Sequence, residues 1–88
     1  MKHLAGLSLS DPEVLDKESY SHSKWERMVV ASNPHTSPTT LTRLALDLSR
    51  GVRSYAEENA STPPLVKLWL TSGYDQSMSL EEFLEATK

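Results

Sequence analysis

Residues 33–38 read NPHTSP, and 26 positions later residues 59–64 read NASTPP, while residues 10–12 (SDP) fit the end of the same pattern. In each copy a hydroxyl residue stands two positions before a proline; these residues are Ser10, Thr36 and Thr62. Such a pair is a helix-start signal, because the hydroxyl accepts hydrogen bonds from free backbone N–H groups and proline fits the first helical turn. Three starts at a constant period predict that one small helical unit is repeated and stacked.

The spacing of apolar residues between these signals predicts helices only, with no strand. The expected helices cover about residues 11–18, 25–32, 38–47, 52–59, 64–72 and 79–86. We expect Ser10 and Thr36 to cap the first and third helices, and Ser79 to open a capping box at the last. The expected buried faces are Trp25, Met28 and Val29; Leu41, Leu44, Ala45 and Leu48; and Val52, Tyr55 and Ala56. Trp25 and Tyr55 could also anchor a partner, but their position on these faces predicts that they belong to the core.

The predicted fold class is all-α: a short right-handed helical-repeat solenoid of about two and a half 26-residue units, closed by a C-terminal capping helix. A chain of 88 residues is expected to form one domain. We divide it into an N-terminal lead-in (1–9), the helical repeat domain (10–73), and a loop with an acidic capping helix (74–88). The net charge of −3 arises in the last part, because acidic and basic residues balance up to residue 73.

Composition argues against several classes of function. The chain has no cysteine, which rules out a disulfide framework, a thiolate metal site and a cysteine-ligated iron–sulfur cluster. The histidines are scattered without ligand spacing, so we expect no metal and no other cofactor. There is no nucleophile elbow and no glycine-rich phosphate loop, so we expect no enzymatic activity. No apolar stretch approaches the ~20 residues that span a bilayer or resembles a secretory signal, which favours a cytoplasmic protein without membrane contact.

A longer part of the pattern resembles a known family. Residues 30–38 (VASNPHTSP), 41–47 (LTRLALD) and 52–53 (VR) resemble the repeat of the bacterial leucine-rich repeat variant, and a looser match extends to about residue 73. The departures are Ala60 in place of Pro34 and Lys67 in place of Leu41. The resemblance implies alternating helices that wind into a superhelix in a bacterial protein, and it implies no catalytic residue. The iron–sulfur domain known in that family cannot be carried over to a chain without cysteine.

The helix that follows Pro64 is apolar around a wide arc. Its apolar residues are Leu65, Val66, Leu68, Trp69 and Leu70. They cover roughly 200° at 100° per residue, whereas a helix with one buried face needs about half of that. Something else must cover Leu65 or Leu68: either the last helix, or a partner protein or second copy of the chain. In the second case Leu65, Leu68 and Trp69 are the partner-binding residues.

Four basic residues offer an alternative function. Lys24 and Arg50 are separated by one full repeat, as are Arg27 and Arg53, so stacked units would place all four in a row that could contact phosphates. Alternatively, Arg27 and Arg53 could pair with acidic neighbours and hold adjacent units together. The candidate acidic partners are Glu26, Asp47 and Glu57.

The sequence therefore predicts a non-catalytic protein–protein interaction module, which presents a rigid helical-repeat surface to another protein or to a second copy. The alternative is a nucleic-acid-binding accessory factor that uses the row of basic residues. Salt distinguishes the two functions, because phosphate contacts weaken steeply as salt rises and apolar contacts do not.

Overall fold

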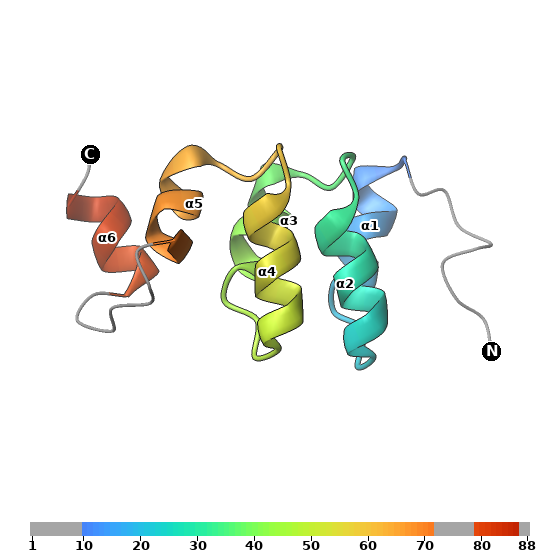
Figure 1. Cartoon of the computed structure of the whole chain (residues 1–88). Coiled ribbons are helices and arrows are strands. Elements are labelled where there is room, and N and C mark those ends of the chain that lie inside the picture. The colour runs from blue at the N-terminus through green and yellow to red at the C-terminus, as the bar shows by residue number, and fades with distance from the viewer. Residues whose placement is uncertain (1–9, 72–78, 87–88) are drawn as a thin grey trace.

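The computed structural model describes residues 10–71 and 79–86, and every regular element within these ranges is an α-helix (Figure 1). The helices are α1 (Pro12–Glu18), α2 (Lys24–Ser32), α3 (Pro38–Leu44), α4 (Arg50–Glu58), α5 (Pro64–Thr71) and α6 (Leu80–Ala86). The predicted all-α class is thus confirmed for this part of the chain, and none of these helices is long and apolar enough to cross a membrane. The predicted lead-in (1–9) and the predicted loop (74–78) lie outside the described residues.

The helix starts follow the period of the sequence. α1, α3 and α5 begin one repeat apart, each at a proline, and α2 and α4 begin at equivalent positions of successive units. The predicted caps Ser10 and Thr36 are wrong by one residue, because Asp11 and Ser37 accept the hydrogen bonds from first-turn N–H groups instead. The reason is that proline occupies the first helical position, which makes the residue directly before it the N-cap.

Thr36 and Thr62 make a different contact, which is the same at both positions. Each hydroxyl is buried and donates a hydrogen bond to a carbonyl in the last turn of the preceding helix: Thr36 to Val30 O (2.6 Å) and Thr62 to Ala56 O (2.5 Å). These bonds satisfy carbonyls that a helix end leaves without an intrahelical partner. The recurring threonine therefore ends the preceding helix rather than starting the next one.

The helices form two rows. In Figure 1, α2 and α4 stand side by side in front of α1 and α3 and run in the same direction, while α5 and α6 follow at the C-terminal end. A first hydrophobic cluster joins α1 to α4 and consists of Leu15, Val30, Ala31, Leu41, Leu44, Val52 and Ala56. A second cluster consists of Ala45, Val66, Leu70 and Leu80, with Trp69 and Leu84 packed against it. The core is therefore a row of small clusters along an elongated molecule of 41 × 21 × 17 Å.

α6 is attached to α5 through the second cluster, to which it contributes Leu80 and Leu84. The capping box predicted at its start is confirmed, because Glu82 N donates to Ser79 Oγ (3.1 Å) and Ser79 N donates to Glu82 Oε1 (3.0 Å). Two otherwise unsatisfied donors are thus paired at the helix start.

The predicted buried faces of α2 and α4 are partly wrong. Trp25 is 69% exposed, Val29 41% and Tyr55 44%, whereas Val30 and Ala31 are the buried residues of α2. α2 and α4 pack closely against each other, and small side chains such as Ala31 fit between neighbouring helices where a tryptophan does not. The aromatic side chains are therefore left on the outer surface.

The third helix is also shorter than predicted. α3 ends at Leu44, and turn-like hydrogen bonds, from Leu46 N to Arg43 O and from Asp47 N to Leu44 O, replace the expected continuation to residue 47. Leu48, which the helical period placed in the core, therefore lies in the loop between α3 and α4 and is 98% exposed.

Asn59 links the two units through its side chain. Its Nδ2 donates to Ala31 O (2.8 Å) and to Asn33 O (2.9 Å), both at the end of α2, while its Oδ1 accepts from Ser61 N (2.8 Å). Because these carbonyls and the amide are buried or nearly so, the amide fixes the end of α4 against the end of α2.

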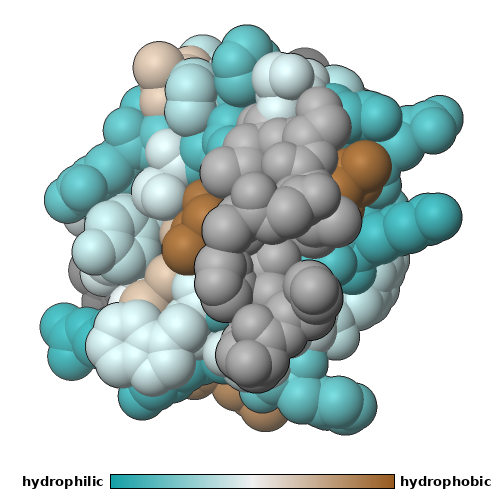
Figure 2. Space-filling model, turned by 90° about the vertical axis from the view of Figure 1, so that its right-hand side faces the viewer, coloured by the Kyte–Doolittle hydropathy of each residue, from teal (hydrophilic) through white to brown (hydrophobic). Residues whose placement is uncertain are grey.

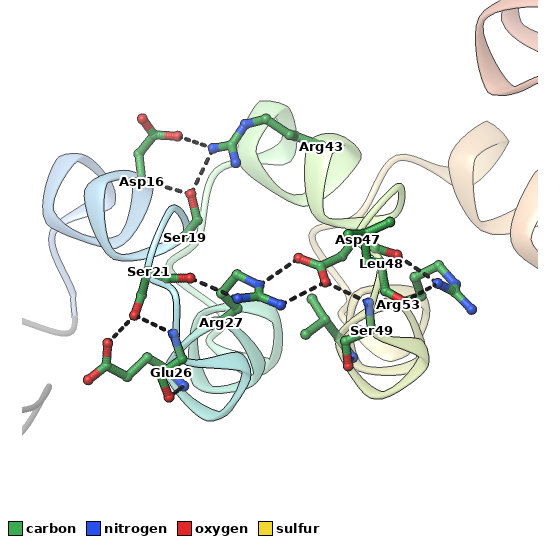
Figure 3. A network of polar contacts seen from close by, with 12 residues as sticks. Asp16, Ser19, Ser21, Glu26, Arg27, Arg43, Asp47, Leu48, Ser49 and Arg53 are labelled. Atoms are coloured by element: carbon green, nitrogen blue, oxygen red, sulfur yellow. Dashed lines mark hydrogen bonds and ion pairs between the residues drawn. The ribbon is translucent and has the colours of Figure 1, made fainter.

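Two junctions occupy equivalent positions in the repeat. In the first junction, between α1 and α3, Arg43 Nη2 donates to Asp16 Oδ1 (2.8 Å) and to Ser19 Oγ (2.7 Å; Figure 3). Thr40 Oγ1 donates to the same Asp16 oxygen (2.7 Å). The second junction, between the end of α3 and α5, is apolar. It consists of Ala45, Val66, Trp69 and Leu70. Ser19, Thr40 and Arg43 correspond, one repeat later, to Ala45, Val66 and Trp69.

Candidate functional site

Arg27, one of the predicted phosphate-binding residues, is held by an acidic neighbour. Its Nε and Nη2 donate to the two carboxylate oxygens of Asp47 (2.8 and 3.2 Å), and its Nη1 donates to Ser21 O (2.8 Å; Figure 3). The side chains of Arg27 and Asp47 are only 18% and 10% exposed. The predicted pairing of Arg27 with Asp47 is confirmed. This bidentate ion pair holds the α3–α4 loop against α2.

Arg53 stands in the equivalent position one unit later and contacts the equivalent loop. Its Nη1 donates to Asp47 O (2.6 Å) and Leu48 O (3.2 Å). The first of these contacts repeats the bond from Arg27 to Ser21 O, because Ser21 and Asp47 are also separated by one repeat. Both arginines therefore brace the loop that precedes their own helix.

Lys24 and Arg50, the other two predicted basic residues, begin α2 and α4 and are exposed. The Lys24 ammonium lies 5.8 Å from the centre of the Trp25 ring, within the range of a cation–π contact. The structure thus does not bring the four predicted cations into one exposed row: two project from helix starts, and two are turned toward the protein.

The predicted partner-binding residues on α5 also divide into two groups. Leu65 and Leu68 are 39% and 54% exposed, whereas Trp69 packs against the second cluster. α6 contributes Leu80 to this cluster, beside the buried Val66, so it covers a different side of α5 from Leu68. Leu65 and Leu68 thus remain exposed, which is what the interpretation with a partner protein or a second copy requires.

A surface pocket beside the α3–α4 loop brings together residues from both sequence hypotheses. It is lined by Leu46, Leu48, Arg50, Arg53 and Trp69, with Ala45 and Asp47. Because Arg53 and Asp47 are engaged in the contacts described above, Arg50 is the charged group that this pocket exposes to solvent.

Exposed aromatic and apolar side chains of α2 and α4 line a groove between these two helices. Its lining residues are Trp25, Met28, Val29, Ser32 and Tyr55. Val29 and Tyr55 are equivalent positions of successive units, and Trp25 corresponds to Gly51. We refer to these five lining residues as the α2–α4 groove.

Gly51 makes room for the floor of this groove. A Cβ atom at position 51 would lie 2.1 Å from Met28 Cε, closer than any real contact, so the methionine side chain crosses the first turn of α4 where glycine stands. The flexible thioether fills this gap between the helices.

Sequence reasoning missed the groove because it assigned Trp25 and Tyr55 to the core. The repeat offered a signal: Val30 and Ala56 are equivalent positions, small in both units, and both are buried. The position of Trp25 is occupied by Gly51 in the next unit. A position at which the side chain changes this much in volume is not expected to form a closely packed core between repeated units.

The described residues contain no group of three or more His, Asp or Glu side chains placed to hold a metal ion. The end of the molecule that faces the viewer in Figure 2 is mostly hydrophilic around the grey segment, with only small, separate hydrophobic areas. The α2–α4 groove, by contrast, combines three large exposed side chains from two helices.

Comparisons of this chain with protein-family models, with curated proteins and with solved structures find no match. A function is therefore inferred from the geometry and chemistry of the molecule alone. The α2–α4 groove is the candidate that involves the most exposed aromatic surface, with the α5 leucines and the exposed cations beside it as further candidates.

Proposed function

We propose that this chain is a short helical-repeat solenoid, similar to the bacterial leucine-rich repeat variant, and serves as a non-catalytic protein-interaction module that binds through the α2–α4 groove. The supporting observation is the exposure of Trp25, Val29 and Tyr55 around one groove. Adjacent exposed aromatic and apolar side chains mark protein interfaces, and tryptophan and tyrosine are the commonest anchors of binding energy.

The walls of the groove are held in place before any partner binds. Asn59 ties the end of α4 to the end of α2, and Arg27 ties α2 to the loop before α4 through Asp47. A surface fixed in this way loses little conformational entropy on binding, which favours affinity from a small contact area. Binding is therefore expected to proceed with little rearrangement of α2 and α4.

Leu65 and Leu68 form a second contact surface within the same proposal. They are exposed on α5, and the neighbouring Trp69 lines the pocket that also contains Arg50. Unlike the groove, this surface has no exposed aromatic side chain among its leucines.

Nucleic-acid binding by Lys24, Arg27, Arg50 and Arg53 is the alternative proposal, and the exposure of Lys24 and Arg50 favours it. With two exposed cations, the expected salt dependence corresponds to about two phosphate contacts, a slope of roughly −1.5 to −2 in log K against log salt. Binding to a labelled single strand that is unchanged in a variant carrying both Lys24→Glu and Arg50→Glu would exclude this alternative.

The main proposal is tested by selecting binders from a displayed random-peptide library on the immobilised chain, then measuring their affinity for variants. We expect Trp25→Ala and Tyr55→Ala each to weaken the selected peptides by about tenfold or more, because anchors of this type contribute roughly 1–2 kcal/mol or more. Thr39→Ala, an exposed change on α3, serves as the matched control and is expected to leave affinity unchanged.

Folding of each variant is checked by thermal unfolding, since changes at exposed positions shift stability by no more than about 0.5 kcal/mol. Peptides that bind wild type and both groove variants equally would show that the groove is not the binding surface. A selection that yields no specific binder at the groove or at the α5 leucines would contradict the proposed function.

A further inference from the structure

We infer that the partner of the α2–α4 groove is the same groove of a second copy, related by a two-fold axis that sets the helices of the two copies antiparallel. This inference rests on the proposed function and names its partner. A two-fold contact pairs one surface patch with itself, so the patch must be complementary to its own rotated image. The exposed charges at the two ends of α4 meet this requirement.

Charge is separated along this face. α2 and α4 run in the same direction (Figure 1), and each begins with an exposed cation, Lys24 and Arg50. The opposite end of α4 carries Glu57 and the exposed Glu58. α4 is therefore basic at its N-terminal end and acidic at its C-terminal end, whereas α2 carries Glu26 beside Lys24 in its first turn and no charge in its last turn.

These charges are placed against the preference of the helix itself. Helix dipoles favour acidic residues in the first turn and basic residues in the last, but α4 has neither and shows the reverse order. Among the described residues, the ion pairs are Arg27 with Asp47 and Arg43 with Asp16, so no pair within one copy compensates Arg50 or Glu58. A contact outside the single copy would provide that compensation.

An antiparallel second copy supplies opposite charges at both ends of α4. Arg50, Ser54 and Glu58 follow at i, i+4 and i+8, so they lie along one exposed stripe of α4 beside Tyr55. Rotation by 180° about an axis near Ser54 brings Arg50 of one copy to Glu58 of the other, twice per dimer. A parallel arrangement would instead place like charges together, which disfavours it.

The middle of the face supplies the apolar contact. Val29 and Tyr55 lie near the middle of these two helices, Trp25 lies beside Lys24 at the start of α2, and each helix of nine residues is about 13 Å long. In the antiparallel arrangement the apolar centre of one copy covers that of the other, with ion pairs at its rim. This order of apolar centre and polar rim is typical of protein interfaces.

The test is sedimentation equilibrium of the full chain over a concentration series from about 1 μM to 1 mM. We expect wild type to reach twice the monomer mass within this range and Val29→Glu to remain monomeric. Arg50→Glu and Glu58→Arg are each expected to weaken the dimer by about five- to tenfold, because each removes the rim contact twice and creates like-charge contacts. The double variant with both changes should return to within about twofold of wild type, since the reversed charges face each other across the axis.

Lys17→Glu, a charge reversal on α1, is the matched control and should leave the dimer constant unchanged. A wild-type chain that is monomeric at 1 mM would overturn the inference, and so would a dimer lost in Leu68→Glu but kept in Val29→Glu, which would locate the contact on α5. Failure of the double variant to recover would overturn the antiparallel arrangement. If the chain is monomeric and peptides still bind the groove, this inference fails and the proposed function stands; if neither binds, both fail.

Discussion

The two junctions of this molecule occupy the same positions of the repeat and have opposite chemistry. At the first junction, Arg43 joins Asp16 and Ser19 and lies 3.9 Å above the centre of the Tyr20 ring. At the second, the residue equivalent to Arg43 is Trp69, which packs in an apolar cluster with Ala45, Val66 and Leu70. The backbone of the unit therefore accepts either a polar or an apolar contact between neighbours, so the chemistry of the junction does not set the period.

What the two units share are their turn and loop residues. Thr36 and Thr62 make the same hydrogen bond, and Arg27 and Arg53 brace equivalent loops. Each of these contacts is a hydrogen bond from a side chain to a main-chain carbonyl six residues earlier. They therefore fix the position of each helix relative to the loop beside it, while the junction residues vary. We expect the two junctions to differ in how much stability they contribute and in how they respond to salt.

The largest effect is expected from breaking the apolar junction. Leu70→Ala removes a side chain that is buried among Ala45, Val66 and Leu80, and we expect a loss of about 2–4 kcal/mol in the free energy of unfolding from lost burial and the cavity left behind. Urea unfolding followed by circular dichroism measures it. Leu68→Ala, on the same helix but exposed, is the control and should change stability by less than about 1 kcal/mol; equal losses would contradict the assignment of the core.

A smaller effect is expected at the polar junction. Arg43→Met keeps much of the contact with Tyr20 but removes the ion pair between Arg43 and Asp16. Because the two side chains are 34% and 47% exposed, we expect the free energy of unfolding to fall by about 1 kcal/mol or less. The same unfolding experiment in low and high salt sharpens the comparison. The difference from wild type should shrink at high salt, because an exposed ion pair is screened, whereas the effect of Leu70→Ala should not shrink.

The smallest effect is expected from Ser19→Ala, which introduces at the polar junction the residue that the apolar junction has at Ala45. Ser19 Oγ donates to Asp16 O and accepts from Arg43, so its removal should cost about 0.5–1 kcal/mol. In the Arg43→Met background the same change should cost less, because the donor to Ser19 is already gone. Additive losses, measured by a double-mutant cycle, would show that the two side chains do not act together.

The helices themselves could be predicted from sequence because their starts depend on local chemistry. Proline at the first helical position and the capping box at Ser79 act within one turn, so local spacing is enough to place them. The threonine signal was found for the wrong reason: its period was correct, but Thr36 bonds backward to Val30 rather than capping forward. The local pattern thus located the threonine correctly but did not show to which helix its hydroxyl is hydrogen-bonded.

The candidate site could not be predicted in the same way, because exposure depends on how helices from different units meet. Trp25, Met28 and Val29 have the spacing of a buried stripe, yet the buried residues of α2 are Val30 and Ala31. Likewise, α3 ends at Leu44, and Asp47 in the loop that follows pairs with Arg27, which lies 20 residues away in the sequence. Amphipathic spacing contains no information on either contact.

The side chain of Asn59 has a consequence for how such a chain can change length. Its amide reaches back 26 and 28 residues, to the carbonyls of Asn33 and Ala31, and the equivalent loops recur at the same distance. A single-residue deletion in the intervening loops would move the amide away from both carbonyls, whereas duplication of one whole unit would recreate the same bonds at a new step. Changes of length that keep this separation between Asn59 and the two carbonyls are therefore expected to preserve the contacts between the ends of α2 and α4.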